Sequence, residues 1–101
     1  MKKLANVHPG EVLKEEFLLP LGVSAYRLSK ETGIPQTRIS QIIKGNRRIT
    51  ADTALRLSFY FGTTPKFWLG LQNDFDIEKE VEKNQVVFNK IRSIERTDSQ
   101  M

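Results

Sequence analysis

The feature that most constrains this sequence is the regular recurrence of residues that start and stop α-helices. Serine, threonine or proline precedes each apolar-periodic stretch, and glycine or proline follows it, about every ten to fifteen residues. Runs of β-branched residues with a period of two, which predict strands, are scarce. The pattern therefore predicts an all-α fold of short helices joined by tight turns.

These signals predict five helices. We expect Pro20 to end the first, because a proline there removes a hydrogen-bond donor and clashes with the preceding turn. Ser24, Thr50 and Thr64 are good N-caps, since their hydroxyls can accept from the orphan amides of a first turn. Gly33 suits the left-handed residue at a helix end. The predicted helices span residues 10–18, 24–32, 35–45, 50–62 and 64–83.

The length of 101 residues suits a single domain. We expect residues 1–83 to form that domain and residues 84–101 to be a short C-terminal extension. Cysteine is absent, which excludes disulfides and thiolate chemistry. No apolar run reaches the roughly 20 residues of a membrane span, and the first residues lack an apolar stretch long enough for a signal peptide. We therefore expect a cytoplasmic protein without membrane contact.

The charge is unevenly distributed along the chain. The net charge is +4, but residues 24–66 contain eight basic and two acidic residues, whereas residues 74–82 contain five acidic residues and one lysine. A basic segment of this kind indicates a surface that binds a polyanion. The acidic segment is either a solvated helix face or a second surface for a basic partner.

The segment around residues 24–44 has the pattern of a helix-turn-helix. Two short helices are separated by a tight turn that contains Gly33, and Ile39 and Ile42 form the buried stripe of the second helix. Ser29 stands where the two helices approach closely, which favours a small side chain. This arrangement is typical of proteins that place their second helix in the major groove of DNA.

The outward face of the helix that follows Pro35 carries side chains that can read bases. Glutamine can pair bidentately with adenine, arginine with guanine, and the threonine methyl can contact thymine. The alternative is a solvated polar face, but the framing turn and the surrounding charge favour DNA contact. The predicted base-contacting residues are Gln36, Thr37, Arg38 and Gln41.

A basic loop follows directly. Phosphate contacts from such a loop would fix the register of the protein on the duplex without reading sequence, and the alternative is again a merely solvated loop. The predicted phosphate-contacting residues are Lys44, Asn46, Arg47 and Arg48. We expect Gln36→Ala or Gln41→Ala to relax base preference, and Arg47→Ala to weaken binding to every sequence.

Other residues carry less information. Phe67, Trp68 and Phe75 either line a ligand pocket or, as is usual at this spacing, pack in the core. His8 is the only histidine, so it has no second ligand for a metal and more plausibly caps or packs the first helix. Glu15 and Glu16 are adjacent and diverge on a helix, so they do not form a catalytic pair. We predict no enzyme activity, no metal and no cofactor.

The residues Leu28, Gly33, Ile39, Ile42 and Gly45 resemble the phage-repressor (Cro/CI, or XRE) family of helix-turn-helix proteins over about residues 23–61. The resemblance implies a five-helix, lambda-repressor-like DNA-binding bundle. By position, it implies base contacts from Gln36, Thr37 and Gln41, with Arg38 and Lys44 secondary.

Two further stretches narrow the resemblance. His8-Pro9-Gly10-Glu11 and the segment from Thr64 to Gln72 are similar to HigA/VapI-type antitoxins, so the likeness extends over about residues 8–77. It implies a homodimer that binds inverted-repeat operator DNA, represses its own operon and neutralises a small, basic, RNA-cleaving toxin of the RelE superfamily. The alternative is a plain Cro/CI-like repressor without a toxin, and a small basic reading frame beside the gene would distinguish the two.

The end of the chain gives weaker signals. Residues 86–94 are rich in apolar side chains, but neither a cap nor a periodic pattern decides their secondary structure. We expect this segment and the fifth helix to make the dimer contacts. Residues 96–101 are polar, and we expect them to be frayed.

Overall fold

The computed structural model describes residues 6–94, which are helical apart from turns and the two ends. One continuous rod comprises α1 (Pro9–Val12), the π-helix η1 (Leu13–Leu18) and α2 (Leu19–Leu21). It is followed by α3 (Ala25–Thr32), α4 (Gln36–Ile43), α5 (Ala51–Phe61) and α6 (Pro65–Asn89). With the rod counted once, the described residues form five helices and no strand, which confirms the all-α, five-helix prediction.

The first helix corrects one prediction, because it passes through Pro20 and ends only at Gly22. The π-helix gives the reason: the Leu19 amide donates to the Lys14 carbonyl, five residues back instead of four. In an α-helix a proline ring collides with the carbonyl four residues back, and the wider π turn relieves that collision. Gly22, with a φ of 65°, then supplies the left-handed residue that ends the rod.

The other helices begin where the sequence predicts. The Ser24 hydroxyl accepts from the Arg27 amide at 3.0 Å, and the Thr64 hydroxyl accepts from the Phe67 amide at 3.1 Å. Thr50 stands at the N-cap of α5, but its hydroxyl makes no capping hydrogen bond. The predicted helix boundaries are therefore confirmed at these three positions, and the predicted capping bond is confirmed at two of them.

The core is centred on Trp68, which is completely buried. Its indole nitrogen donates to the Thr63 hydroxyl at 2.8 Å, and Phe17 from η1 packs on the ring at 5.0 Å between centroids. The core interpretation therefore holds for Trp68, whereas Phe67 packs edge-on against the indole but is 39% exposed, and Phe75 is half-buried outside the core. The other buried apolar side chains include Leu13, Leu28, Ile39, Ile42, Ile49 and Leu57.

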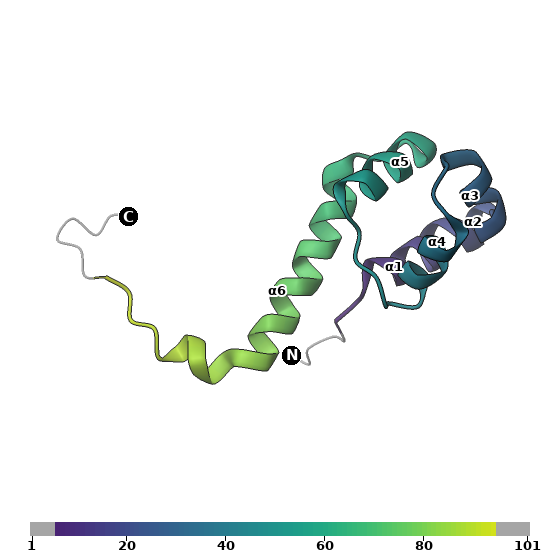
Figure 1. Ribbon diagram of the computed structural model, residues 1–101. Coiled ribbons are helices and arrows are strands. Elements are labelled where there is room, and N and C mark those ends of the chain that lie inside the picture. Colours follow the sequence, from purple (N-terminus) through teal and green to yellow (C-terminus); the bar gives the residue numbers. More distant parts are fainter. Residues whose placement is uncertain (1–5, 95–101) are drawn as a thin grey trace.

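The last helix gives the molecule its elongated shape. α6 packs on α5, then leaves the bundle and projects away from it together with residues 90–94 (Figure 1). Asn84 has non-helical angles of −125° and 28°, so the helix kinks there before it ends at Asn89. The secondary structure that the sequence left open after residue 83 is therefore helical as far as Asn89. The expected fraying of residues 96–101 lies outside the described residues.

The principal extents of the molecule are 56 × 27 × 25 Å. Within residues 6–94, none of the helices combines the length and the apolar character needed to cross a bilayer.

Candidate nucleic-acid interface

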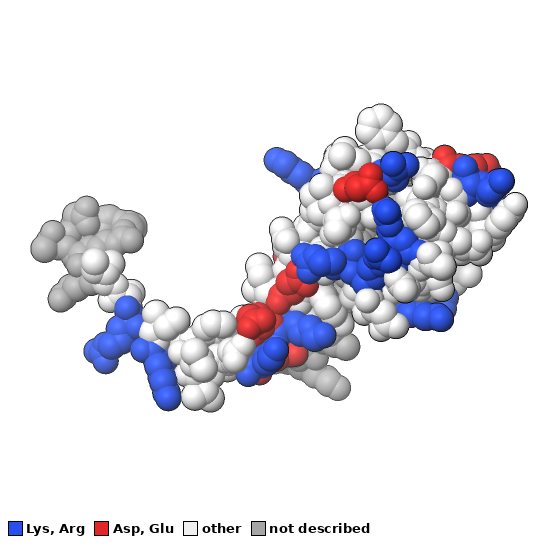
Figure 2. Space-filling model, viewed as in Figure 1, with Lys and Arg blue, Asp and Glu red and all other residues white. Residues whose placement is uncertain are grey.

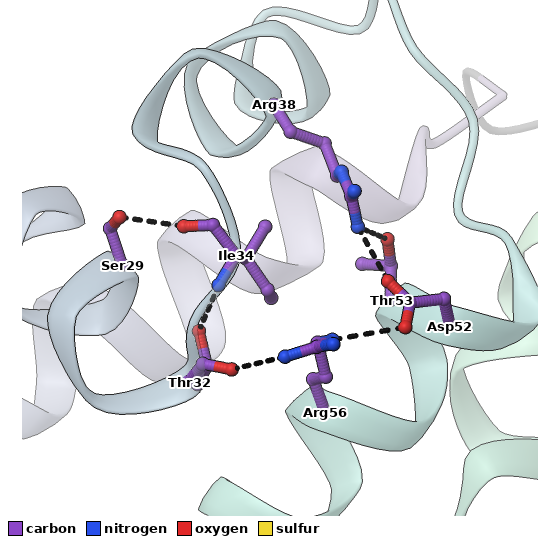
Figure 3. Close-up of polar contacts among 7 residues, drawn as sticks. All are labelled: Ser29, Thr32, Ile34, Arg38, Asp52, Thr53 and Arg56. Atoms are coloured by element: carbon purple, nitrogen blue, oxygen red, sulfur yellow. Dashed lines mark hydrogen bonds and ion pairs between the residues drawn. The ribbon is translucent and has the colours of Figure 1, made fainter.

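The turn between α3 and α4 is fixed by hydrogen bonds from both sides. Gly33 has a φ of 79°, and its amide donates to the Ser29 carbonyl, which closes α3. The Ser29 hydroxyl donates to the Ile34 carbonyl at 2.6 Å, and the Ile34 amide donates to the Thr32 hydroxyl at 3.2 Å (Figure 3). Ser29 therefore does more than leave room, because its hydroxyl holds the turn that sets the angle between the two helices.

The inner face of α4 is buried against the rest of the bundle. Ile39 and Ile42 are each 1% exposed. The backbone of Ile42 also contacts Gly10 of α1, where a Cβ built on the glycine would stand 1.7 Å from the Ile42 carbonyl oxygen. Only glycine fits this contact, so α1 fixes the C-terminal end of α4 through a close approach of two backbones.

Three of the predicted base-contacting residues lie on the solvent side of α4. Gln36, Thr37 and Gln41 are exposed, and Thr37 and Gln41 stand one turn apart on the same face. Because the opposite side of α4 is locked into the core, this face is presented to solvent on a rigid helix.

Arg38 differs from these three because its guanidinium is engaged with α5. It donates to the Asp52 carboxylate at 2.7 Å and to the Thr53 hydroxyl at 3.2 Å (Figure 3). Asp52 also pairs with Arg56 at 3.0 Å, and Arg56 donates to the Thr32 carbonyl at 2.9 Å. Hydrogen bonds from Arg38 and Arg56 keep the pKa of Asp52 below its usual range. This network connects the ends of α3, α4 and α5, and a base contact from Arg38 would require its ion pair to open.

The basic loop after α4 brings together all four predicted phosphate-contacting residues. Lys44, Asn46, Arg47 and Arg48 are exposed and adjoin the end of α4. Gly45 has a φ of 80°, which lets the chain turn back towards α4. Arg47 donates to the Gln41 side-chain oxygen at 2.7 Å, whereas Arg48 pairs with Asp76 of α6 at 2.8 Å.

The sequence did not reveal what supports this loop from behind. Gln72 of α6 is only 2% exposed, accepts from the Ile49 amide at 2.7 Å and donates to Asp76 at 3.0 Å. A lone glutamine on an amphipathic helix gives no local signal for this role, because its partner stands 23 positions earlier. The loop is therefore tied to α6 through a buried amide.

His8 has the packing and capping role that the sequence suggested. Its Nδ1 atom accepts from the Gly10 amide at 2.9 Å, and its ring packs edge-on against Phe75 at 4.8 Å. Burial lowers the pKa of His8 below its usual value. Among residues 6–94, no three histidine, cysteine or acidic side chains converge in a way that could hold a metal ion.

The charges form two adjoining regions. Figure 2 shows lysine and arginine side chains gathered over the middle of the bundle, with acidic side chains beside them along α6. The face that presents α4 and its loop is therefore suited to a polyanion, and the neighbouring helix is suited to a basic group.

Comparison with known proteins gives consistent results. A family model described as helix-turn-helix matches residues 13–68. Virulence-associated protein I of Dichelobacter nodosus is 43% identical over 85 residues, which cover 84% of this chain and 79% of that protein.

Two solved structures are also similar. An addiction module antidote protein of the HigA family from Coxiella burnetii is 42% identical, with a TM-score of 0.84 over 90% of this chain and 100% of that one. The Pseudomonas aeruginosa antitoxin HigA, solved with the higBA promoter, is 29% identical, with a TM-score of 0.85 over the same shares of the two chains.

Proposed function

The chain belongs to the helix-turn-helix (XRE-type) family and resembles its HigA and VapI members, and from this premise we propose that it is a DNA-binding antitoxin. In this proposal it binds operator DNA as a homodimer, represses its own operon, and neutralises a small basic RNA-cleaving toxin of the RelE superfamily. The observation that carries the DNA-binding part is the exposed polar face of α4, held rigidly beside a basic loop.

The geometry supports a division of roles among the exposed residues. Gln36, Thr37 and Gln41 would reach base edges, because they lie on the solvent side of a helix whose opposite side is buried. The loop residues Lys44, Asn46, Arg47 and Arg48 would contact phosphates. We assign Arg38 chiefly to holding α4 against α5, since its guanidinium already binds Asp52 and Thr53.

Titration of labelled duplexes from the region upstream of the gene tests the DNA-binding part. Gln36→Ala should lose about 1–3 kcal/mol of discrimination at one base pair. Arg48→Ala should weaken binding to all duplexes alike and reduce the slope of log affinity against log salt by about 0.9. Equal, sequence-independent losses from both variants would contradict this division of roles.

The projecting end of α6 supports the homodimer. Val86 near the end of α6 is 67% exposed in the single chain, and Ile91, just after the helix, is 69% exposed. A run of exposed apolar side chains of this kind marks a surface that a partner covers. A two-fold pair joined here would present two α4 helices to successive major grooves about 34–36 Å apart, so the operator would be an inverted repeat.

Sedimentation velocity tests the dimer with a matched pair of variants. Val86→Glu should shift the chain towards monomer, because it puts a charge into the proposed contact. Leu21→Glu changes an equally apolar residue that is 59% exposed on the body of the bundle, and it should leave the dimer intact. A chain that is monomeric before any substitution would refute the dimer.

The acidic stretch of α6 supports a basic protein partner. Its acidic side chains lie along α6 beside the basic region, and one of them, Asp76, already pairs with Arg48 of the loop, so this helix can hold a basic group. The test is co-expression with the product of the adjacent small basic reading frame, followed by an RNA-cleavage assay. The proposal requires a stable complex in which cleavage is suppressed. If cleavage persists at excess antitoxin, the toxin claim fails and a plain repressor is the better description.

A further inference from the structure

The chain reverses so tightly after α4 that Arg47 lies over Gln41. The Gly45 amide donates to the Ile42 carbonyl, and the Asn46 amide donates to the Gln41 carbonyl, both at 2.9 Å. This double closure around a left-handed glycine fixes the path of the next residue. Arg47 consequently reaches the Gln41 side chain, with 2.7 Å between its guanidinium nitrogen and the amide oxygen Oε1.

Chemistry alone determines which way the Gln41 amide faces. A guanidinium has hydrogen-bond donors and no acceptor, so the atom that it contacts must be the amide oxygen. The amide nitrogen, with its two hydrogens, is therefore directed away from Arg47. Since both side chains are exposed at the end of α4, the pair presents donors on its open side.

We propose that Gln41 and Arg47 act as one unit that selects guanine in the operator. This inference rests on the proposed DNA binding and specifies the base that the site prefers. A free glutamine pairs with adenine by donating to N7 and accepting from the N6 amino group. Here the accepting oxygen is occupied by a cation, which disfavours the approach of another donor. Guanine offers two acceptors, N7 and O6, and matches a surface made of donors.

Arg47 is thus a positioning residue for base recognition as well as a phosphate-contacting one, and its neighbour provides a matched control. Arg48 is also exposed and carries the same charge, but its guanidinium pairs with Asp76 instead of Gln41. A merely electrostatic role predicts the same behaviour from both arginines, whereas the proposed role predicts different behaviour.

The experiment begins with selection of duplexes from a randomised pool by the full-length chain. The base pair read by Gln41 is the one at which Gln41→Ala loses its preference. Two duplexes that differ only there, with guanine or adenine, are then titrated with the wild type, Arg47→Ala, Arg48→Ala, Gln41→Ala and the Gln41→Ala/Arg47→Ala double variant. Circular dichroism checks that each variant is folded.

The wild type should bind the guanine duplex about tenfold more tightly than the adenine duplex. Arg47→Ala should abolish or invert this ratio, because the freed oxygen can then accept from adenine. Arg48→Ala should weaken binding to both duplexes by one common factor. Adding Arg47→Ala to the Gln41→Ala variant should likewise weaken binding to both duplexes equally.

A wild-type preference for adenine would overturn the inference, and so would an unchanged ratio in Arg47→Ala. Either result would leave the DNA-binding function standing. A chain that selects no duplex at all would overturn the proposed function itself, and this inference with it.

Discussion

The close contact between the backbones of α1 and α4 can be tested by adding a single methyl group at Gly10. In Gly10→Ala the new Cβ would stand 1.7 Å from the Ile42 carbonyl oxygen, half of the 3.4 Å at which ordinary contact begins. A backbone oxygen cannot rotate away as a flexible side chain does, so α1 must move off the end of α4. Overpacking of this kind costs about 1–3 kcal/mol, and the better helix propensity of alanine returns at most about 1 kcal/mol.

We therefore expect Gly10→Ala to lower the free energy of unfolding by about 1–2 kcal/mol, which would lower the melting temperature by roughly 5–15 °C. Urea titration followed by Trp68 fluorescence measures this well, since Trp68 is the only tryptophan and is fully buried. DNA affinity should fall as well, because the same shift moves the helix that carries Gln41.

Gly70→Ala is the matched control for this prediction. Gly70 lies inside α6, and a Cβ built there meets nothing within 4 Å. The same substitution should therefore raise the free energy of unfolding by about 0.5–1 kcal/mol. The reasoning is refuted if Gly10→Ala is as stable as the wild type, or if the two substitutions change stability in the same direction.

Three further predictions concern the support of the loop. Burial lowers the pKa of His8, so the stability that its neutral ring provides is complete above the usual imidazole pKa of about 6.5 and is lost as the pH falls below that value. The free energy of unfolding, measured by urea titration, should therefore decline between about pH 7.5 and about pH 5.5. His8→Asn, which can still cap the helix, should make this decline smaller. Gln72→Leu should cost about 1–3 kcal/mol in the same assay, because it leaves the buried Ile49 amide without an acceptor. Asp76→Asn should raise the affinity for every duplex up to about fivefold in titrations, because it releases Arg48 from an exposed ion pair.

The sequence predicts most of the fold, because the signals for individual helices are local. Ser24 and Thr64 cap helices through atoms only a few residues away, and Gly33 ends a helix through its own backbone angle. Pro20 is the instructive exception. Whether a proline ends a helix depends on whether the preceding turn is α or π, and no nearby residue predicts the π-helix found here.

The candidate site divides in the same way between what is local and what is not. The exposure of Gln36 and Gln41 follows from the helical period, once Ile39 and Ile42 are assigned to the core. The engagement of Arg38 could not be predicted, because a residue on the edge of a helix face can turn either to solvent or to a neighbour. Which of the two occurs depends on the packing angle of α5.

The contacts that the sequence hides are the ones that make the site rigid. Gly10 meets Ile42 across 32 positions, and Gln72 meets Ile49 across 23, so neither pair shares a pattern that a window along the chain could detect. Each contact involves a backbone group, and because every residue has one, the residue type at that position gives no signal. A polar face on a helix can therefore be predicted from its own residues, whereas its presentation as a fixed recognition surface depends on residues whose importance appears only after the chain has folded.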